Sequence, residues 1–253
     1  MRALLQDIDR LLRGRYTEAA ELRLGKITIP TRNLVVAGLL LGCLYGVFMG
    51  IYGATRPVNA DWLQLVATTF KVPLLFLLTL VVTFPSLYAM SALAGSRMQF
   101  QETLRLLLAA VAINLALLAS LGPVVGFFTL STQSYPFMVL LNVFFFAASG
   151  VAGLVFLRRA LTHVFAGATD SEAASASPDP DAKKARLALG SRGDPALTVF
   201  RAWLVVYGVV GAQMGWVLRP FIGSPEHPFE LFRERESNFF TAVGNLFVDL
   251  FGS

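Results

Sequence analysis

Long apolar runs separated by short polar stretches dominate this chain. Five of them approach or exceed the roughly 20 helical residues that cross a hydrocarbon core. They cover 34–52, 72–93, 106–130, 136–157 and 202–217. The last run is short, but cations and tryptophans flank it as snorkelling groups and an aromatic belt do. These are Arg201, Trp203, Trp216 and Arg219. The pattern predicts an all-α, polytopic membrane bundle of five transmembrane helices.

Amphipathic periodicity predicts further, shorter helices at both ends of the chain. Near the N-terminus it involves Leu4, Leu5, Ile8, Leu11 and Leu12. That helix lies on an anionic leaflet or packs on the protein's own cytoplasmic face. A second stripe begins after Ser237 or Asn238, either of which can cap a helix of about 13 residues, too short to span. This stripe predicts either a helix at the membrane interface or a helix that plugs against the bundle.

A semi-polar stretch precedes the second run. Residues 61–70 place Trp62, Leu63, Val66 and Phe70 on one stripe. We expect an interfacial helix there, and a break at 71–73, where a lysine and a valine precede a proline.

The chain divides into five parts by composition. The amphipathic cytoplasmic segment covers 1–32, and spans one to four cover 33–165. Residues 166–197 are rich in Ala, Ser, Pro and Asp and have no aromatic residue, which predicts a disordered cytoplasmic linker with a possible short helix at 183–189. The fifth span covers 198–222, and an extracytoplasmic tail covers 223–253.

The placement of Lys and Arg predicts the orientation. Sixteen of the 21 lie on the side of the N-terminus and the linker, and five lie on the other side. Because positive charge favours the cytoplasmic side, we expect a cytoplasmic N-terminus and an extracytoplasmic C-terminus in a bacterial inner membrane.

Composition indicates a membrane protein and offers few candidates for catalytic or metal-binding residues. Hydrophobic residues make up 55% of the chain and charged residues 15%, against about 25% in soluble domains. Cys43 is the only cysteine, so one chain has no disulfide. The sequence contains no phosphate loop, no HExxH and no nucleophile elbow, so we expect neither an enzyme nor a cofactor. His227, with Glu226 and Glu230, lacks the further ligands that a metal site requires.

Glycines recur every fourth residue in the first run, at Gly38, Gly42, Gly46 and Gly50. Such a face lets two helices approach closely in lipid. It predicts either a homo-oligomer seam, as in a glycine zipper, or packing against another span of the same chain. The fifth run carries a similar face that we expect to be its partner: Gly208, Gly211 and Gly215.

Uncharged polar groups within the runs are candidates for lining a permeation path, although a bent packing helix is equally consistent with them. They are Thr79, Thr83, Pro85, Ser86, Asn114, Asn142 and Gln213. We expect Gln213 to hydrogen-bond Asn142 or Asn114. The near absence of charges in the spans argues against a transporter coupled to protons or sodium.

Cations on the predicted outer side form an outer basic ring in an oligomer, or serve singly as interface anchors. The candidates are Arg56, Lys71, Arg219, Arg233 and Arg235.

Two stretches resemble signatures of an uncharacterised bacterial family of multi-span inner-membrane proteins: KVPLLFLLTLVVTFPSLYAMSALAGSR (71–97) and QMGWVLRPFIGSPEHPFELFRERESNFF (213–240). The five-span layout is also similar to that of the Yip family of membrane-trafficking proteins, whose Asp-Leu-Tyr-Gly-Pro motif this chain lacks. These resemblances imply membrane topology and no functional residues.

The leading hypothesis is a homo-oligomeric passive channel or pore subunit, with membrane lipids around it. The alternatives are an adaptor that organises a membrane complex, with a cytoplasmic partner at 166–197, and a lipid-handling protein that uses the aromatic region 216–232. Nothing in the sequence indicates a nucleic-acid partner.

Overall fold

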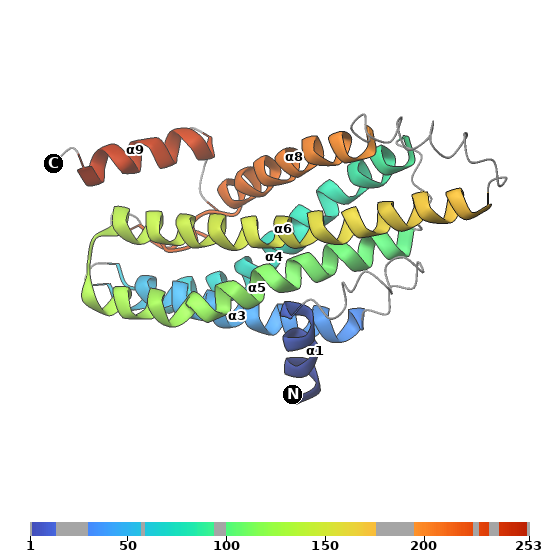
Figure 1. Cartoon of the computed structure of the whole chain (residues 1–253). Coiled ribbons are helices and arrows are strands. Elements are labelled where there is room, and N and C mark those ends of the chain that lie inside the picture. Colours follow the sequence, from blue (N-terminus) through green and yellow to red (C-terminus); the bar gives the residue numbers. More distant parts are fainter. Residues whose placement is uncertain are drawn as a thin grey trace.

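A computed structural model describes residues 2–13, 30–56, 59–93, 100–175, 195–224, 228–232 and 238–251. All regular elements in these ranges are helices (Figure 1). They are α1 (Arg2–Leu12), α3 (Thr31–Thr55), α4 (Trp62–Leu93), α5 (Phe100–Ser131), α6 (Tyr135–Ser175), α8 (Pro195–Val217) and α9 (Phe239–Phe251). The predicted all-α membrane bundle is confirmed.

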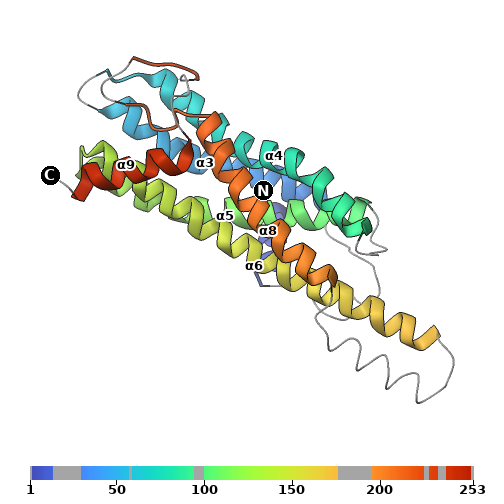
Figure 2. The ribbon, with the colours of Figure 1, turned by 90° about the horizontal axis from the view of Figure 1, so that it is seen from above.

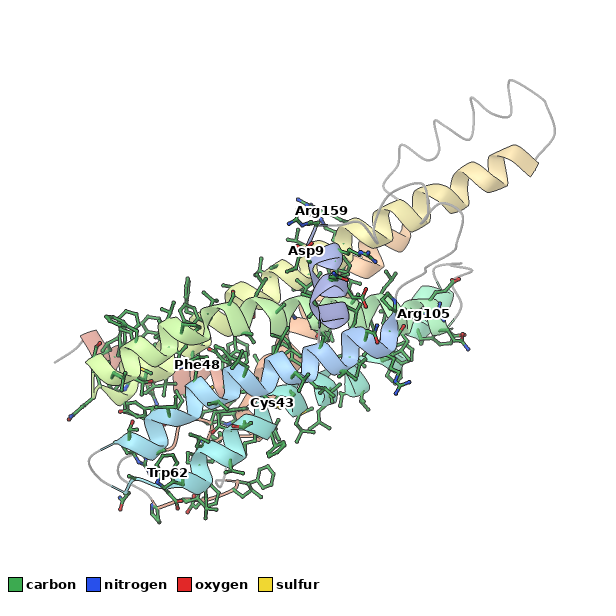
Figure 3. The ribbon with its side chains drawn as sticks, turned by 90° about the horizontal axis from the view of Figure 1, so that it is seen from below. Asp9, Cys43, Phe48, Trp62, Arg105 and Arg159 are labelled. Atoms are coloured by element: carbon green, nitrogen blue, oxygen red, sulfur yellow. The ribbon has the colours of Figure 1, made fainter. Side chains whose placement is uncertain are left out.

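Within the described ranges, four helices are long and apolar enough to cross a membrane. These segments are Thr31–Thr55, Trp62–Ala89, Gln101–Ser131 and Tyr135–Arg159. The predicted fifth span corresponds to α8, whose apolar part, Ala202–Val217, is shorter than these four. In Figure 3, Arg105 and Arg159 lie toward one end of the bundle and Trp62 toward the other, with Cys43 and Phe48 between them.

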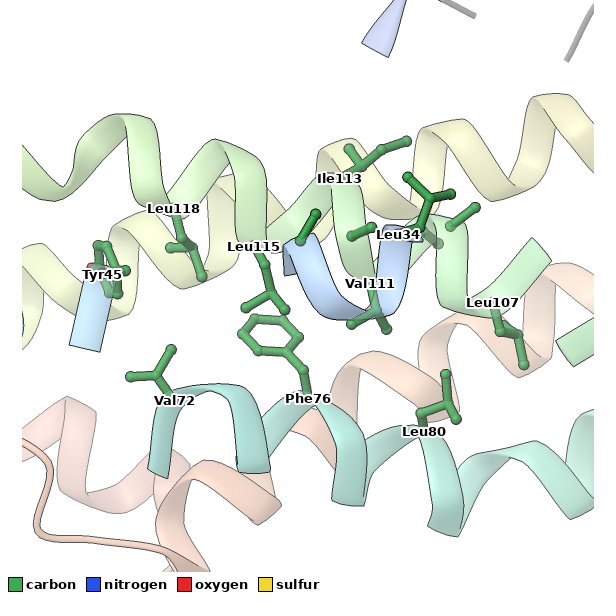
Figure 4. Packing of buried hydrophobic residues seen from close by; sticks show 14 of the residues in the cluster. Leu34, Tyr45, Val72, Phe76, Leu80, Leu107, Val111, Ile113, Leu115 and Leu118 are labelled. Atoms are coloured by element: carbon green, nitrogen blue, oxygen red, sulfur yellow. The ribbon is translucent and has the colours of Figure 1, made fainter. Parts of the chain in front are cut away.

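Helix α3 packs against both α4 and α5. The core between these helices is apolar and closely packed: Leu115 of α5 faces Phe76 of α4, and both side chains are buried (Figure 4). Helix α6 packs on α5, and α8 packs on α4. Because lipid is as apolar as these side chains, close packing rather than hydrophobic exclusion holds such helices together.

The N-terminal helix α1 runs across the bundle axis (Figure 1). Ile8 and Leu11 are buried against the bundle, and Nδ2 of Asn33 donates a hydrogen bond to Oδ2 of Asp7 over 2.9 Å. Of the two predicted placements, the structure shows packing on the protein's own surface.

Helix α4 corrects the prediction of a break at 71–73. It continues from Trp62 to Leu93 with Pro73 and Pro85 inside it. Proline normally breaks a helix because its ring clashes with the preceding turn and it lacks an N–H. Here the ring packs against Gly42 of α3, where a Cβ would lie only 3.2 Å from Cβ of Pro73. The predicted stripe at 61–70 is confirmed as an exposed apolar face of this longer helix.

The predicted linker is also partly wrong. Helix α6 extends to Ser175, ten residues into the range expected to be disordered, and α8 already begins at Pro195. Ala168, Glu172, Ala173 and Ala174 are good helix formers within this polar stretch. Residues 176–194, including the helix expected at 183–189, lie outside the described residues.

The C-terminal helix α9 forms where its periodicity predicted it. Oδ1 of Asn238 accepts a hydrogen bond from the backbone N–H of Thr241 over 3.0 Å, which makes Asn238 the N-cap. Seen from above, α9 begins beside the end of α8 and lies along the first turns of α6 (Figure 2).

Candidate functional site

Three polar side chains form a row along one face of α4. Gln64, Thr68 and Lys71 are spaced by four and three residues, which places them on successive turns of the same helix face. All three are buried, with exposed fractions of 2%, 0% and 4%. We call them the donor row, because each directs an N–H or O–H group at backbone carbonyls from a distant part of the chain.

Those carbonyls belong to the docked segment, residues 218–224 and 228–232, between α8 and α9. Nε2 of Gln64 donates to the carbonyls of Phe221 (2.7 Å) and Pro220 (3.2 Å). The hydroxyl of Thr68 donates to Phe221, and Nζ of Lys71 donates to Pro220 (3.0 Å) and to Leu231. The donor row therefore satisfies carbonyls that no helix or sheet pairs.

The docked segment lies alongside spanning helices. A Cβ on Gly53 of α3 would lie 2.9 Å from the carbonyl oxygen of Ile222, and Pro73, two residues after Lys71, meets Gly42 near the middle of α3. Helix side chains tilt toward the helix N-terminus, so Lys71 extends back toward the end of the bundle where α4 begins. It reaches the docked segment by snorkelling.

The two cationic side chains of this site, Lys71 and Arg219, each lie close to an aromatic ring. Nζ of Lys71 lies 5.2 Å from the centroid of the Phe232 ring, and the guanidinium of Arg219 lies 3.7 Å from that of Trp216. Both distances are within the range of cation–π attraction. The peptide bond between Arg219 and Pro220 is cis.

No protein-family model matches this chain, and neither the curated proteins nor the solved structures gave a significant match. The resemblances noted from the sequence therefore stay predictions.

The glycine face of α3 packs inside the chain. A Cβ on Gly46 would lie 2.7 Å from Cα of Thr69, and one on Gly50 would lie 2.7 Å from Cα of Leu65. Gly42 meets Pro73 and Leu115, and Gly38 meets Ala112 of α5. Of the two predicted uses, packing against another span is the one found, since α4 and α5 already cover this face.

The sequence led us to expect that the glycine face of α8 packs against that of α3. The structure shows that these two faces do not meet. Within the described residues nothing lies within 4 Å of a Cβ built on Gly208 or Gly215, and Gly211 meets only the methyl group of Thr79. Helix α8 packs on α4 instead, because α3 is covered by α4 and α5.

The hydroxyl groups among the predicted path-lining residues are bonded within their own helix. The hydroxyls of Thr79, Thr83 and Ser86 donate to carbonyls of α4 itself, at 2.7–2.8 Å. Ser86 also accepts a hydrogen bond from Nε1 of Trp203, and Pro85 lies on an exposed face.

The three amides are also among the predicted path-lining residues. Asn142 accepts a hydrogen bond from Tyr45 and donates one to the carbonyl of Met138, and Gln213 is not among its partners in the described structure. Asn114 is buried against Gly153 of α6, and its Oδ1 has no hydrogen-bond partner among the residues that the structure describes. The predicted bond from Gln213 to either asparagine is wrong.

Lys71 also corrects the predicted outer basic ring. The Lys71 side chain is buried between α4 and the docked segment rather than exposed at the surface. The spacing of the donor row was visible in the sequence, but its partners lie about 150 positions later, and no local pattern reveals them. Groups of metal-binding side chains are absent from the described part of the chain.

Proposed function

We propose that this membrane protein is a passive channel or pore subunit of a bacterial inner membrane. The docked segment carries the proposal: a non-helical stretch held beside spanning helices by buried donors. Lipid cannot satisfy free backbone groups, so irregular backbone at membrane depth occurs where protein buries it or where it borders a water-filled path. Backbone carbonyls in such segments are common ligands of permeating ions.

The path lies between copies of the chain in this proposal. Within one chain, the crevice between α3, α4 and α5 is lined by Leu34, Gly38, Leu77, Val111 and neighbouring apolar groups, which do not solvate an ion. Helix α8 leaves Gly208 and Gly215 uncovered in the described structure, and a second copy fits against such a small-residue face.

The test combines particle mass with flux. In lipid nanodiscs we expect a closed ring of several copies, and in liposomes an ion flux that needs no coupling gradient. Replacing Gly208 and Gly215 by Leu should dissociate the ring and abolish the flux, whereas Gly150→Leu, on α6, should do neither. A monomer without flux under any applied voltage contradicts the proposal.

A lipid-handling function is the second candidate. The cation–aromatic pairs of Arg219 with Trp216 and Lys71 with Phe232 favour it, because such pairs occur where anionic headgroups meet the bilayer surface. Lipid that stays bound through delipidation, and is lost on Trp216→Ala, would favour this function over a channel.

The adaptor and its cytoplasmic partner rest on residues 166–197, most of which lie outside the described residues. That the chain is not an enzyme stays a prediction from its motifs.

A further inference from the structure

The ammonium group of Lys71 sits in a site made by the docked segment. Two carbonyl oxygens, from Pro220 and Leu231, accept its hydrogen bonds, and the ring of Phe232 lies beside it. We call these three groups the carbonyl cradle. Among the described residues, no carboxylate forms an ion pair with Lys71, and the cradle supplies the groups that contact its ammonium there.

The chemistry of the cradle suits an ammonium group in general. A primary ammonium has three N–H donors and no acceptor, and carbonyl oxygens together with an aromatic face complement it. A free alkylammonium ion presents the same head group as the lysine side chain.

Part of the cradle is held in place without Lys71. Gln64 and Thr68 bind the carbonyls of Pro220 and Phe221 from the same face of α4. Removal of the Lys71 side chain therefore leaves a docked carbonyl row with a gap of the size of an alkylammonium ion.

Charges of both signs flank the cradle in the chain. Arg219 precedes Pro220, but its guanidinium stacks on Trp216. Glu230 precedes Leu231 and adds negative charge nearby. The groups that contact the ammonium directly are the two carbonyl oxygens and the ring of Phe232.

We propose that the carbonyl cradle is a binding site for primary ammonium ions and that Lys71 is its tethered occupant. This inference rests on the proposed channel function for its physiological meaning: the permeating ion is then a small cation that competes with Lys71. A lysine that fills the site keeps it closed to other cations until the docked segment moves.

Chemical rescue tests the proposal. In a Cys43→Ala background, Ile222→Cys places a reporter at a buried position of the docked segment, where Ile222 is 3% exposed. Labelling by a hydrophilic maleimide then reports release of the segment in nanodiscs. Lys71→Ala should raise the labelling rate about tenfold or more, since hydrogen bonds to a charged group are among the stronger ones. Millimolar n-propylammonium should reverse most of that rise.

Three controls keep the result specific. Tetramethylammonium, which has no N–H donor, and neutral n-propanol should have no effect on Lys71→Ala. Lys71→Met fills the gap with an uncharged chain, so n-propylammonium should not act on it. Equal effects of all three additives, or none of n-propylammonium, would overturn the proposal.

A second variant guards against misfolding of Lys71→Ala. Phe232→Leu keeps Lys71 and removes only the ring, so it should raise labelling at position 222 severalfold, and n-propylammonium should leave that rise unchanged. Unchanged labelling contradicts the cradle. Amine rescue without ion flux would support the cradle and contradict the channel function. Ion flux of the unaltered protein without amine rescue would support the channel function and contradict the cradle.

Discussion

The hydroxyl of Tyr45 in α3 donates a hydrogen bond to Oδ1 of Asn142 in α6, 2.6 Å away. Both side chains are almost fully buried. Nδ2 of Asn142 donates in turn to the carbonyl of Met138 at 2.8 Å. The two residues are 97 positions apart in the chain, and their hydrogen bond joins α3 to α6.

Tyr45→Phe should destabilise the bundle by about 1–2 kcal/mol, because it leaves Oδ1 of Asn142 buried without a donor. Unfolding in mixed detergent with increasing denaturing detergent measures this. Adding Asn142→Leu should recover part of the loss. Tyr52→Phe is the matched control: that hydroxyl bonds the carbonyl of Gln133 near a helix connection, so a smaller loss is expected. Equal losses at both tyrosines would contradict the assignment.

Gly46→Ala should destabilise the contact between α3 and α4 by about 1–3 kcal/mol, since a methyl group forces packed backbones apart. The new Cβ would lie 2.7 Å from Cα of Thr69 and 2.8 Å from the carbonyl oxygen of Thr68. Gly150→Ala, where nothing lies within 4 Å, should be neutral or slightly stabilising. Unfolding of both variants in the same detergent series provides the comparison.

Gly153→Ala should destabilise the packing of α6 on α5, because its Cβ would lie 2.1 Å from Oδ1 of Asn114. The variant Asn114→Ala removes that obstacle, so the double variant should be more stable than Gly153→Ala alone. A double-mutant cycle measures this coupling. Additive effects of the two substitutions would show that Asn114 does not occupy the space above Gly153.

Thr68→Val should loosen the docked segment without changing side-chain volume much. It removes the hydroxyl that bonds the carbonyl of Phe221, at a cost of about 1 kcal/mol. Hydrogen–deuterium exchange should accelerate in residues 218–224. Thr55→Val is the control, because that hydroxyl bonds only the carbonyl of Ile51 in its own helix. Faster exchange in both variants, or in neither, would contradict the role of Thr68.

Periodicity along the sequence predicted that the apolar helices exist, because apolar faces and caps are local properties, but it did not predict the unbroken course of α4 or the extension of α6 to Ser175. Asn238 illustrates this: a polar residue before an apolar stripe predicted the cap that α9 has. The glycines of α3 correctly signalled a close approach, but spacing alone does not identify the helix that approaches.

The path of α4 and the role of Lys71 could not be predicted in this way. Helix α4 continues through Pro73, and the ring of this proline packs against Gly42 of another helix, a contact that no local pattern indicates. Lys71 looked like a surface anchor because its partners, Pro220 and Leu231, lie in a region without regular pattern. Both properties involve contacts between distant segments.

The unbroken course of α4 links its two ends mechanically. The first turns of α4 pack against α3 at Thr69 and bind the docked segment through Lys71. Its later turns pack against α8 near Thr79. A displacement of the docked segment that pulls on Lys71 must therefore either carry the rest of the helix with it or be absorbed by bending. Pro73 and Pro85 lack the hydrogen bonds that stiffen a helix, so bending would concentrate at these two positions.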